Sequence, residues 1–525
     1  MEKEYISISL AKPDTPQLDV VQKGALTLGL LGLALLLVVS FGFTFTDNAI
    51  PLSLSLSAIL VGTVVYTRRT YLNQPAGIKN NGVYFKSLTS RGAVGWAVGI
   101  GLTLLYVLLY WFPQYLGLGK DGAANSGLVA LFDPLSQLLK GQPASQWFVY
   151  GTLYTLAILA FGYKFILKYR HNRYQVFRTI SVMFFQLSFA FLLPEFLLRL
   201  NYPYNDFKNM WPLNYYFFDE WSINGFLSSG NLGLFMLIFG IAMIFVISPI
   251  LTYLYGKRWY CSWVCGCGGL AETAGDPFRQ LSSKKVSAWR FERWSIHLVT
   301  VFSILMTVGV LTSYLGNNPD KSVITRAQLT WGLVGLFLLI GILVAFFRRK
   351  HFSQQTRAIF LSVAALMAGV VLIHYFSTPD KVLFIDSQQL RSTYGFLIGA
   401  AFSGVIGVGF YPLLGSRVWC RFGCPMAAIL GFQQRIFSRF RITTNGGQCI
   451  SCGNCSTYCE MGIDVRAYAQ SEQNIVRSSC VGCGICSAVC PRGVLKLENG
   501  SPNNRMKEDP AFIGNADNLM EYINK

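Results

Sequence analysis

Charged residues are scarce in this chain. They make up 13% of 525 residues, against 52% hydrophobic residues, and the mean hydropathy is +0.41. Acidic residues are scarcer than basic ones, at 25 against 44, so the formal net charge is +19. These values exclude an ordinary water-soluble protein and indicate a polytopic membrane protein. In such a protein an excess of Lys and Arg is typical of cytoplasmic loops, so we expect no nucleic-acid partner.

Histidine is also rare, and this argues against haem. The four are His171, His297, His351 and His374. A two-haem cytochrome b needs two axial histidines at each of two depths in the membrane. Only His374 is expected near the outer end of a span, so that arrangement is rejected, and a single inner haem is disfavoured. The chain also lacks a Gly-rich nucleotide loop and a hydrolytic set of residues.

No cysteine is scattered through the apolar segments or the other loops. All 13 cysteines lie in clusters, eight of them near the end of the sequence. Clustered cysteine without isolated pairs indicates metal ligation in a reducing compartment rather than extracellular disulfides. The first 23 residues contain acids and bases, and no small-residue cleavage site follows the first apolar run. We therefore expect no cleaved signal peptide.

The eight cysteines form two runs with the spacing of a bacterial two-cluster ferredoxin. Both runs read C-x2-C-x2-C-x3-C, and Pro491 follows the second. In that pattern three thiolates of a run bind one cluster and the fourth reaches the other cluster. We therefore predict two 4Fe-4S clusters; a zinc ribbon or a disulfide set is disfavoured. The expected ligand sets are Cys449, Cys452, Cys455 and Cys490 for the first cluster, and Cys480, Cys483, Cys486 and Cys459 for the second.

The other five cysteines lie in two matching segments. Residues 256–265 and 415–424 both read G-x-R-x-aromatic-C-x3-C, and each follows an apolar segment with a proline in its last turns. Weaker echoes are Tyr-Leu-Gly at 115–117 and 314–316, and a histidine behind a basic residue after the fourth and eighth apolar segments. We infer that spans three to six and seven to ten are parallel repeats.

Two such repeats would bring the C-x3-C pairs face to face. The four thiols are Cys261, Cys265, Cys420 and Cys424. Residues i and i+4 share one face of a helix, so each pair is expected to ligate jointly. Four thiolates suit a third iron–sulfur cluster, with Cys267 as a possible substitute for Cys265. A redox-active dithiol, a transient copper site and a structural role are the alternatives.

About ten apolar segments are long enough to cross a bilayer of about 30 Å. Basic residues concentrate in alternate loops, whereas the other loops are balanced, for example Lys120 and Lys140 against Asp121 and Asp133. The positive-inside rule then places both termini and the ferredoxin module in the cytoplasm, at the inner membrane. The predicted spans are 24–46, 50–67, 92–113, 146–167, 179–199, 231–255, 294–316, 329–347, 357–376 and 394–414.

Three further features carry expectations. The aromatic loop at 201–230 is read as a belt at the membrane interface, with partner docking as the alternative. Residues 427–441 are predicted to form a basic amphipathic helix on the inner membrane surface. Glu195, inside the fifth span, is a candidate for quinone or proton chemistry, with an ion pair to Arg199 as the alternative.

The fold class is thus an α-helical polytopic membrane protein with a C-terminal two-cluster ferredoxin-like α+β module. The expected organisation is 1–91 with two transmembrane helices, 92–267 as the first repeat, 268–426 as the second, 427–500 as the ferredoxin module and 501–525 as a polar tail. All predicted clusters lie at or below one face of the membrane. Since the hydrocarbon core is about 30 Å thick, transfer across it would need a quinone or a partner subunit.

Two C-x3-C(P) motifs followed by a two-cluster ferredoxin module resemble the NosR/NapH/CcoG group of membrane-bound polyferredoxins. The clearest carriers are WCRFGCP at 419–425 and the cysteine runs at 449–491. The resemblance implies electron transfer between a quinol or cytoplasmic donor and a partner, for a respiratory reductase or for metal-centre maturation. Departures leave the subfamily open: Gly266 follows the first C-x3-C where the group has proline, and Glu460 follows Cys459 where proline is usual. The extra soluble domains of NosR and CcoG are not recognised, and NapH has fewer spans.

The sequence therefore predicts an integral-membrane electron-transfer protein, an oxidoreductase subunit rather than a self-contained enzyme. Electrons would pass between a cytoplasmic carrier, such as a soluble ferredoxin or flavodoxin, and a membrane quinone or partner redox subunit. A basic face favours an acidic donor. The alternatives are a copper reduction or assembly factor for a respiratory enzyme and a redox-driven ion-translocating subunit; few ionisable residues in the spans argue against the latter.

Overall fold

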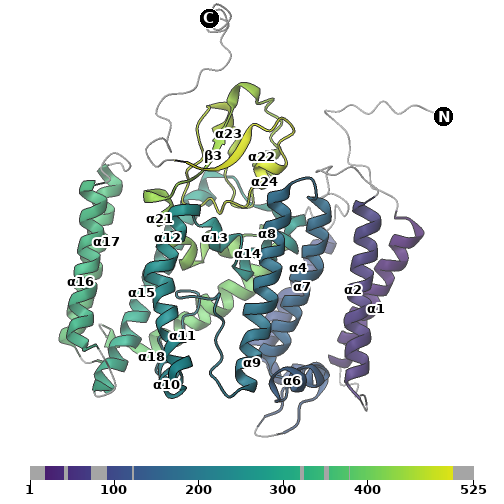
Figure 1. The fold of residues 1–525 in the computed structure, drawn as a ribbon, viewed down its shortest axis with the longest axis horizontal. Helices are drawn as coiled ribbons and strands as arrows, with labels where there is room; N and C mark the ends of the chain where they lie inside the picture. Colours follow the sequence, from purple (N-terminus) through teal and green to yellow (C-terminus); the bar gives the residue numbers. More distant parts are fainter. Residues whose placement is uncertain are drawn as a thin grey trace, which may run out of the picture.

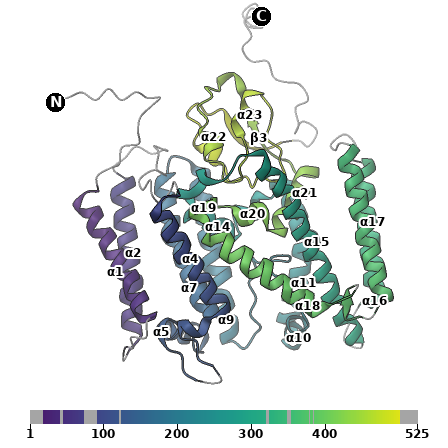
Figure 2. The same ribbon diagram turned by 180° about the vertical axis from the view of Figure 1, so that it is seen from behind.

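The computed structural model describes residues 18–40, 45, 47–72, 91–120, 123–319, 324–347, 354–377, 379–382 and 384–500. Long helices stand side by side in one layer, and a small domain of short helices and strands lies at one end of them (Figures 1 and 2). The predicted tail at 501–525, His351 and much of the basic loops after the second and eighth spans lie outside the described residues.

Nine helices among the described residues are long and apolar enough to cross a membrane. Each overlaps a predicted span, with ends that differ by up to eight residues, as for α15 at 286–317 against 294–316. For the remaining predicted span, 357–376, the structure has α17 (Gln354–Phe376), whose apolar part Phe360–Phe376 is shorter. The nine are α1 (Val20–Ser40), α2 (Ala49–Tyr71), α4 (Ala93–Trp111), α7 (Gln146–Lys168), α8–η2–α9 (Arg173–Phe184, Phe185–Leu192, Leu193–Arg199), α11–η3–α12 (Gly230–Ala242, Met243–Ile247, Ser248–Tyr255), α15 (Val286–Asn317), α16–η6 (Arg326–Ile342, Leu343–Phe347) and α18–η8 (Ser387–Tyr394, Gly395–Gly409).

Three of these spans change their helical pitch just before a proline. The π-helical segments η2, η3 and η8 end at Leu192, Ile247 and Gly409, and Pro194, Pro249 and Pro412 follow shortly after. Proline lacks an N–H and its ring collides with the carbonyl four residues earlier, so the wider turn relieves the clash while the helix continues. In the span that contains η8, the last turn forms a separate short helix, α19 (Tyr411–Leu414).

Short helices close the membrane layer at the end opposite the small domain. They are η1 (Pro113–Leu116), α5 (Gly127–Leu131), α6 (Asp133–Lys140) and α10 (Glu220–Ser228), and a two-stranded ribbon pairs β1 (Lys381–Val382) with β2 (Ile385–Asp386). The two Tyr-Leu-Gly segments that support the predicted repeat, 115–117 and 314–316, have different backbone structures. Gly117 ends η1 with φ +95°, whereas residues 314–316 continue the helix α15.

The connection between α9 and α10 departs from the interfacial belt predicted for the aromatic loop. It rises among the helices towards the middle of the layer (Figure 1). Lys208, Met210 and Phe217 are buried, and Trp211 Nε1 donates to Thr307 Oγ1 over 2.8 Å. The expectation of an interfacial belt is therefore wrong for this part of the loop. Its aromatic rings fill space between helices, which composition alone does not distinguish from a belt.

The small domain contains one antiparallel ribbon and several short helices. Strand β3 (Phe440–Thr444) pairs with β4 (Leu495–Asn499), from Phe440 opposite Asn499 to Thr444 opposite Leu495. Between the strands lie η9 (Gly446–Gln448), α22 (Asn454–Thr457), α23 (Val465–Gln470) and α24 (Ile485–Ala488). The domain is thus α+β.

The helix predicted at 427–441 is shorter and more deeply placed than expected. α21 runs over Pro425–Phe437, and 440–444 form β3 instead. Met426, Ala427, Leu430 and Gln434 are buried, and α21 packs against α12 and α15. Its apolar face is covered by protein, which the amphipathic pattern cannot distinguish from cover by lipid.

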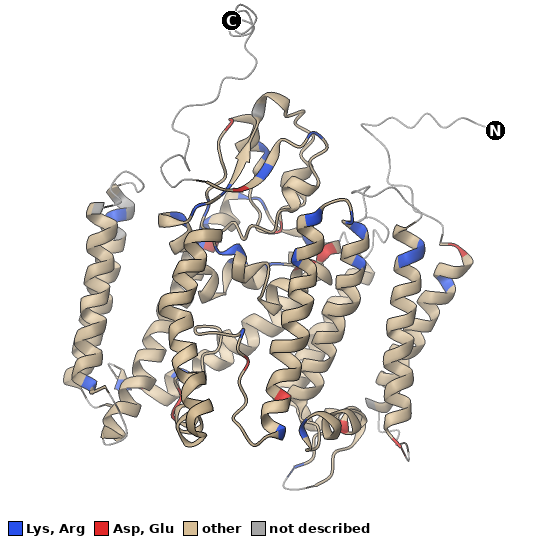
Figure 3. Ribbon diagram, in the orientation of Figure 1, with Lys and Arg blue, Asp and Glu red and all other residues tan. Residues whose placement is uncertain are grey.

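Lys and Arg gather at the end of the helices where the small domain lies (Figure 3). Basic residues of this end include Arg170, Lys257, Lys284 and Arg421, which contact other parts of the protein there. The predicted charge asymmetry between the two membrane faces is therefore present in the fold.

Candidate iron–sulfur centres and their setting

The eight ferredoxin cysteines surround two small cavities in the α+β domain. Cys449, Cys452, Cys455 and Cys490 line one cavity, and Cys459, Cys480, Cys483 and Cys486 line the other. Each set joins three cysteines of one run with the fourth of the other run, which is the grouping that the spacing predicts. Gly453 and Gly484, with φ +78° and +75°, precede α22 and α24 and turn the chain equivalently in both runs.

The donor chemistry of both cavities fits a 4Fe-4S cluster. None of the 13 cysteines is in a disulfide. Burial raises the pKa of Cys455 and of Cys459 to about 11, and that of Cys483 to about 12. Free thiols in these positions would stay protonated at neutral pH, whereas a bound metal ion deprotonates a coordinating thiol. Four thiols around each cavity meet the ligand requirement of a cubane cluster.

The two C-x3-C segments share one local structure. Gly256 (φ +68°, ψ 179°) and Gly415 (φ +99°, ψ 169°) end the preceding helices in a conformation that is essentially restricted to glycine. A one-turn helix with the first cysteine follows, and the second cysteine then caps a further helix. These helices are α13 (Arg258–Cys261) and α14 (Gly266–Thr273) in one segment, and α20 (Val418–Phe422) and α21 in the other.

The expectation that each pair shares one helical face is wrong. Cys261 ends α13, but Cys265 lies before α14 with φ −64° and ψ 125°, and Cys424 precedes α21 with φ −87° and ψ 109°. The chain turns between the two cysteines of each pair. Joint ligation is nevertheless allowed, because the turn brings the second thiol back towards the first.

The four C-x3-C thiols belong to one buried cluster. Cys261, Cys265, Cys420 and Cys424 are all buried, and each has at least one of the others as an electrostatic neighbour. Arg417 Nη1 donates to Cys420 Sγ at 3.6 Å and to the carbonyl of Cys261 at 3.2 Å, and so bridges the two segments. The N–H of Ala427 donates to Cys424 Sγ at 3.4 Å.

Cys267 lies beside Cys265. A hydrogen bond between the two side chains lowers the pKa of Cys265 and raises that of Cys267. Cys267 is also an electrostatic neighbour of Cys420 and Cys424. Five thiols therefore meet at this place, and either Cys265 or Cys267 is available as the fourth donor.

Two buried lysines approach this cluster of thiols from opposite sides. Lys257 comes from the segment itself and has Cys261 and Cys480 as electrostatic neighbours, so it lies between the C-x3-C thiols and one ferredoxin set. Lys208 comes from the inserted α9–α10 connection; its charge acts on Cys265, and its Nζ donates to Gln186 Oε1 at 3.1 Å. Buried cations suit a site that would hold an anionic thiolate-bound cluster.

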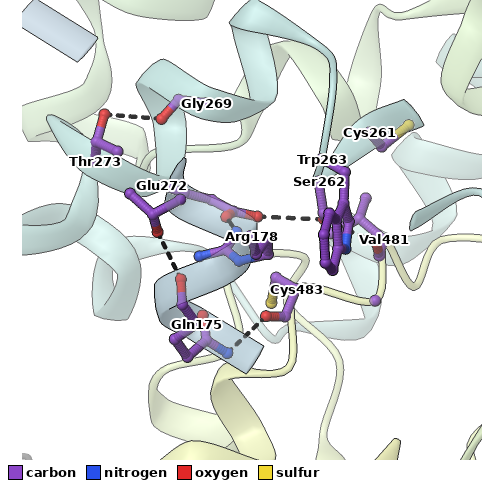
Figure 4. A network of polar contacts seen from close by, with 12 residues as sticks. Gln175, Arg178, Cys261, Ser262, Trp263, Gly269, Glu272, Thr273, Val481 and Cys483 are labelled. Carbon is purple, nitrogen blue, oxygen red and sulfur yellow. Dashed lines mark hydrogen bonds and ion pairs between the residues drawn. The ribbon is translucent and has the colours of Figure 1, made fainter. Parts of the chain in front are cut away.

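A buried network of ion pairs joins the α+β domain to the helices below it. Glu460, which follows the last cysteine of the first run, accepts from Arg417 Nε and from Arg279 Nη1, both at 2.8 Å. Arg417 also pairs with Glu272 of α14, and Arg178 of α8 pairs with the same carboxylate (Figure 4). Burial alone would raise the pKa of Glu460, but Arg279 and Arg417 lower it on balance.

The network continues to the end of α7. Arg279 of η4 (Asp276–Leu281) donates to Asp276 over 2.9 Å, and Lys168 pairs with Asp276 over 2.6 Å. Ser262 Oγ donates to the carbonyl of Val481, and Gln175 Nε2 donates to that of Cys483. The first C-x3-C segment and α8 thus hold the loop of the second ferredoxin run directly, as Figure 4 shows.

Two carboxylates of this network approach a cysteine. Donor atoms of Glu272, Glu460 and Cys483 lie within 4.8 Å of one another. Both carboxylates already pair with arginines, so this group is explained by the ion-pair network. Sequence reasoning missed Lys208, Glu272 and Asp276, which have no spacing signal; Glu460 in place of proline was the one available sign.

The remaining candidates lie elsewhere. Arg199 donates to the carbonyl of Leu138 and not to Glu195, so the proposed Glu195–Arg199 pair is wrong; Lys140 is the charged neighbour of Glu195. His374 contacts Thr312 and the carbonyl of Lys381. His171 Nε2 lies 3.4 Å from the carbonyl of Ala488.

Comparison with known proteins supports the iron–sulfur assignment. The family "4Fe-4S dicluster domain" matches residues 441–491, and the family "4Fe-4S binding domain" matches twice, at 236–287 and 397–443. The two latter matches contain the two C-x3-C segments. The chain is 24% identical over 224 residues to YccM of Escherichia coli (strain K12), which is named as an electron transport protein. That match covers 43% of this chain and 47% of YccM, about half the length of each. No solved structure matches.

The chain therefore carries 4Fe-4S ferredoxin-type domains on a helical body with nine candidate membrane-spanning helices in its described part. Together with a relative named for electron transport, this supports iron–sulfur electron transfer.

Proposed function

We propose that this protein passes electrons between a carrier at the cytoplasmic face and a membrane quinone or partner redox subunit, through a row of three thiol-held centres. The observation that carries the proposal is one continuous buried cluster, from the α+β domain to the ends of the membrane helices, which contains or packs against the thiols of all three sets except the exposed Cys452. Iron–sulfur clusters, when bound, supply one-electron storage at each set.

The residues that would hold the clusters are the three predicted sets. Cys449, Cys452, Cys455 and Cys490 form the outermost, and Cys459, Cys480, Cys483 and Cys486 the middle one. The innermost consists of Cys261, Cys420, Cys424 and either Cys265 or Cys267. Arg417 and Lys257 lie between the sets and reduce the cost of negative charge there.

The surrounding protein holds the α+β domain against the helices and covers the middle and innermost sets. The Arg417–Glu460 and Arg279–Glu460 pairs fix the α+β domain on the helices, and the buried neighbours exclude water. The basic end of the helices would attract an acidic soluble donor such as a ferredoxin or flavodoxin. The orientation with this end in the cytoplasm follows from the positive-inside rule.

Anaerobic quantitation of iron and sulfide with EPR spectroscopy tests the proposal. Wild type is expected to contain about twelve iron atoms per chain, and Cys420→Ser about eight, with the ferredoxin signals retained. Electron transfer from dithionite to a membrane acceptor should be blocked in the variant. About eight iron atoms in both proteins, or unaltered turnover in Cys420→Ser, would refute a third cluster in the relay.

The fifth thiol, Cys267, which packs against the buried cluster that contains Cys265, favours thiol or copper chemistry as the second candidate. A role in metal-centre assembly would be supported instead if the protein bound one copper ion per chain and lost it on mutation of Cys261 or Cys420.

A further inference from the structure

A large cavity lies among the membrane-spanning helices next to the C-x3-C thiols. Its volume is about 480 Å³, within the usual range for small-molecule sites. The walls come from α2, α4 and α7, with α14, η4 and residues near α19 closing the end towards the α+β domain. The lining residues of α7 run from Tyr150 to Lys164, about 21 Å of helix.

The cavity is open to a ligand that enters from the membrane. Helix α2 packs against α1 and α7, but in the described part of the chain it makes little contact with α4. The walls between these helices are mainly apolar and include Leu102, Leu105 and Phe161. An occupant must therefore carry a long apolar portion.

The other end of the cavity is polar. Tyr106, Tyr150, Tyr154 and Tyr411 line it. The first three rings form a connected group, with Tyr106 and Tyr150 centroids 5.9 Å apart and Tyr150 and Tyr154 centroids 5.4 Å apart. Lys164 lies further along α7. Tyrosine hydroxyls can donate hydrogen bonds to the carbonyl oxygens of a ring-shaped head group.

The polar end adjoins the C-x3-C thiols. Cys267 is an electrostatic neighbour of all four tyrosines. Along α14, Cys267, Leu270 and Ala274 are spaced i, i+3 and i+7 and share one face, and Leu270 and Ala274 line the cavity. Cys267 therefore lies on the face of this segment that closes the cavity, which places the cavity beside the thiol cluster.

We infer that this cavity binds an isoprenoid quinone, with its ring among the tyrosines and its tail between α2 and α4. The inference rests on the proposed function and names its membrane acceptor. Reduction of the quinone requires two electrons, delivered by two one-electron carriers of the class proposed above, and two protons from water, which convert its two carbonyl oxygens to hydroxyls. Both carriers are oxidised by one electron.

The chain offers a matched pair of substitutions to test this site. Leu105 lines the cavity, whereas its neighbour Leu104 is 55% exposed on the outside of α4. Leu105→Trp should fill the cavity, and Leu104→Trp should place the same ring in lipid. The full-length protein is reconstituted in phosphatidylcholine vesicles and labelled with a photoreactive azido-quinone.

We expect the azido-quinone to label peptides of α4 or α7 in wild type. The amount of label should fall at least tenfold in Leu105→Trp and should change less than twofold in Leu104→Trp. Dithionite-driven reduction of menaquinone should follow the same order. Label confined to other helices in wild type, equal label in all three proteins, or retention of phospholipid that quinone does not displace, would overturn the inference. If the Leu105→Trp protein does not accumulate in cells, the position of the label in the wild-type protein still tests the inference.

Failure of this site and failure of the relay give different results. If wild type reduces a water-soluble dye but neither binds nor reduces menaquinone, the relay stands and the quinone site is refuted. If Cys420→Ser leaves dye and menaquinone reduction unchanged, the relay is refuted, and labelling still decides what occupies the cavity.

Discussion

Single buried charges organise the contact between the α+β domain and the membrane helices. Glu460 occupies the position where ferredoxin runs usually have proline. Its carboxylate accepts from Arg279 and Arg417, one of which belongs to the second C-x3-C segment. The departure from the usual pattern therefore has a structural role, because without Glu460 the buried Lys168, Arg178, Arg279 and Arg417 would share only two carboxylates, those of Glu272 and Asp276.

Glu460→Gln should strongly destabilise the protein. Breaking a buried ion pair by removing one partner costs about 3–5 kcal/mol, because the remaining charge stays uncompensated. Glu498→Gln is the control: its pair with Arg441, at 3.6 Å, is partly exposed and should contribute less than about 1 kcal/mol. Thermal unfolding of both variants in the same detergent gives the comparison. Equal unfolding temperatures would contradict a structural role for Glu460.

Lys208 is the residue that brings a positive charge to the C-x3-C thiols from the far side of the membrane layer. A nearby cation favours the more negative, reduced form of a bound cluster. Lys208→Met should therefore lower the midpoint potential of the innermost centre by roughly 60 mV, a tenfold change in a one-electron equilibrium. EPR-monitored redox titration measures this, with exposed Lys120→Met as control. An unchanged potential in Lys208→Met would mean that Gln186 and its surroundings screen the charge.

At the scale of elements, two glycine corners set the C-x3-C geometry. Gly256 and Gly415 turn the chain from a span into the one-turn helix that carries the first cysteine. A Cβ on Gly415 would lie 2.4 Å from Ser282 Oγ and 2.8 Å from the backbone N of Ser282. Both the backbone conformation and the close packing therefore require glycine at this position.

Gly415→Ala should cost about 1–3 kcal/mol of local backbone strain and displace α20 with Cys420. Iron content should fall from about twelve towards about eight atoms per chain while the ferredoxin signals persist. Gly101→Ala in α4 is the control, since a Cβ there meets nothing within 4 Å. Full iron content in Gly415→Ala would show that the corner tolerates a side chain.

At the scale of the whole molecule, the basic end of the helices and the α+β domain coincide (Figure 3). In the proposed function, one property, the excess of Lys and Arg, would serve both membrane orientation and attraction of an acidic donor. The opposite end, with α5, α6 and α10, is reached by the inserted α9–α10 connection, which extends from there to the C-x3-C thiols.

Reporter fusions test the orientation. Alkaline phosphatase fused after Gly141, in the turn that follows α6, should be active, because the proposed orientation places that end outside the cytoplasm. Fusion after Lys285, just before α15, should be inactive, and green fluorescent protein at the same position should fluoresce. The reverse pattern would place the α+β domain outside the cytoplasm and exclude a soluble cytoplasmic donor.

The sequence by itself determined the chemistry and the order of the spans. Cysteine spacing is a local property, since three ligands of each cluster come from one tight loop. Each long apolar run can likewise be recognised on its own, without knowledge of the rest of the chain. Comparison with known families supports ferredoxin-type domains at 441–491 and related segments around both C-x3-C motifs. The positions of nine spans agree for the same reason.

The tertiary structure decided what depends on residues far apart in the chain. The Glu460 network, Lys208 beside Cys265 and the tyrosine-lined cavity join segments separated by dozens to hundreds of residues, and no spacing rule reports such contacts. It also overturned the interfacial belt for the buried part of the 201–230 loop, and the placement of the 427–441 helix on the membrane surface. Apolar and aromatic side chains gain similar free energy against lipid and against protein, so hydrophobic pattern alone cannot tell which of the two covers them.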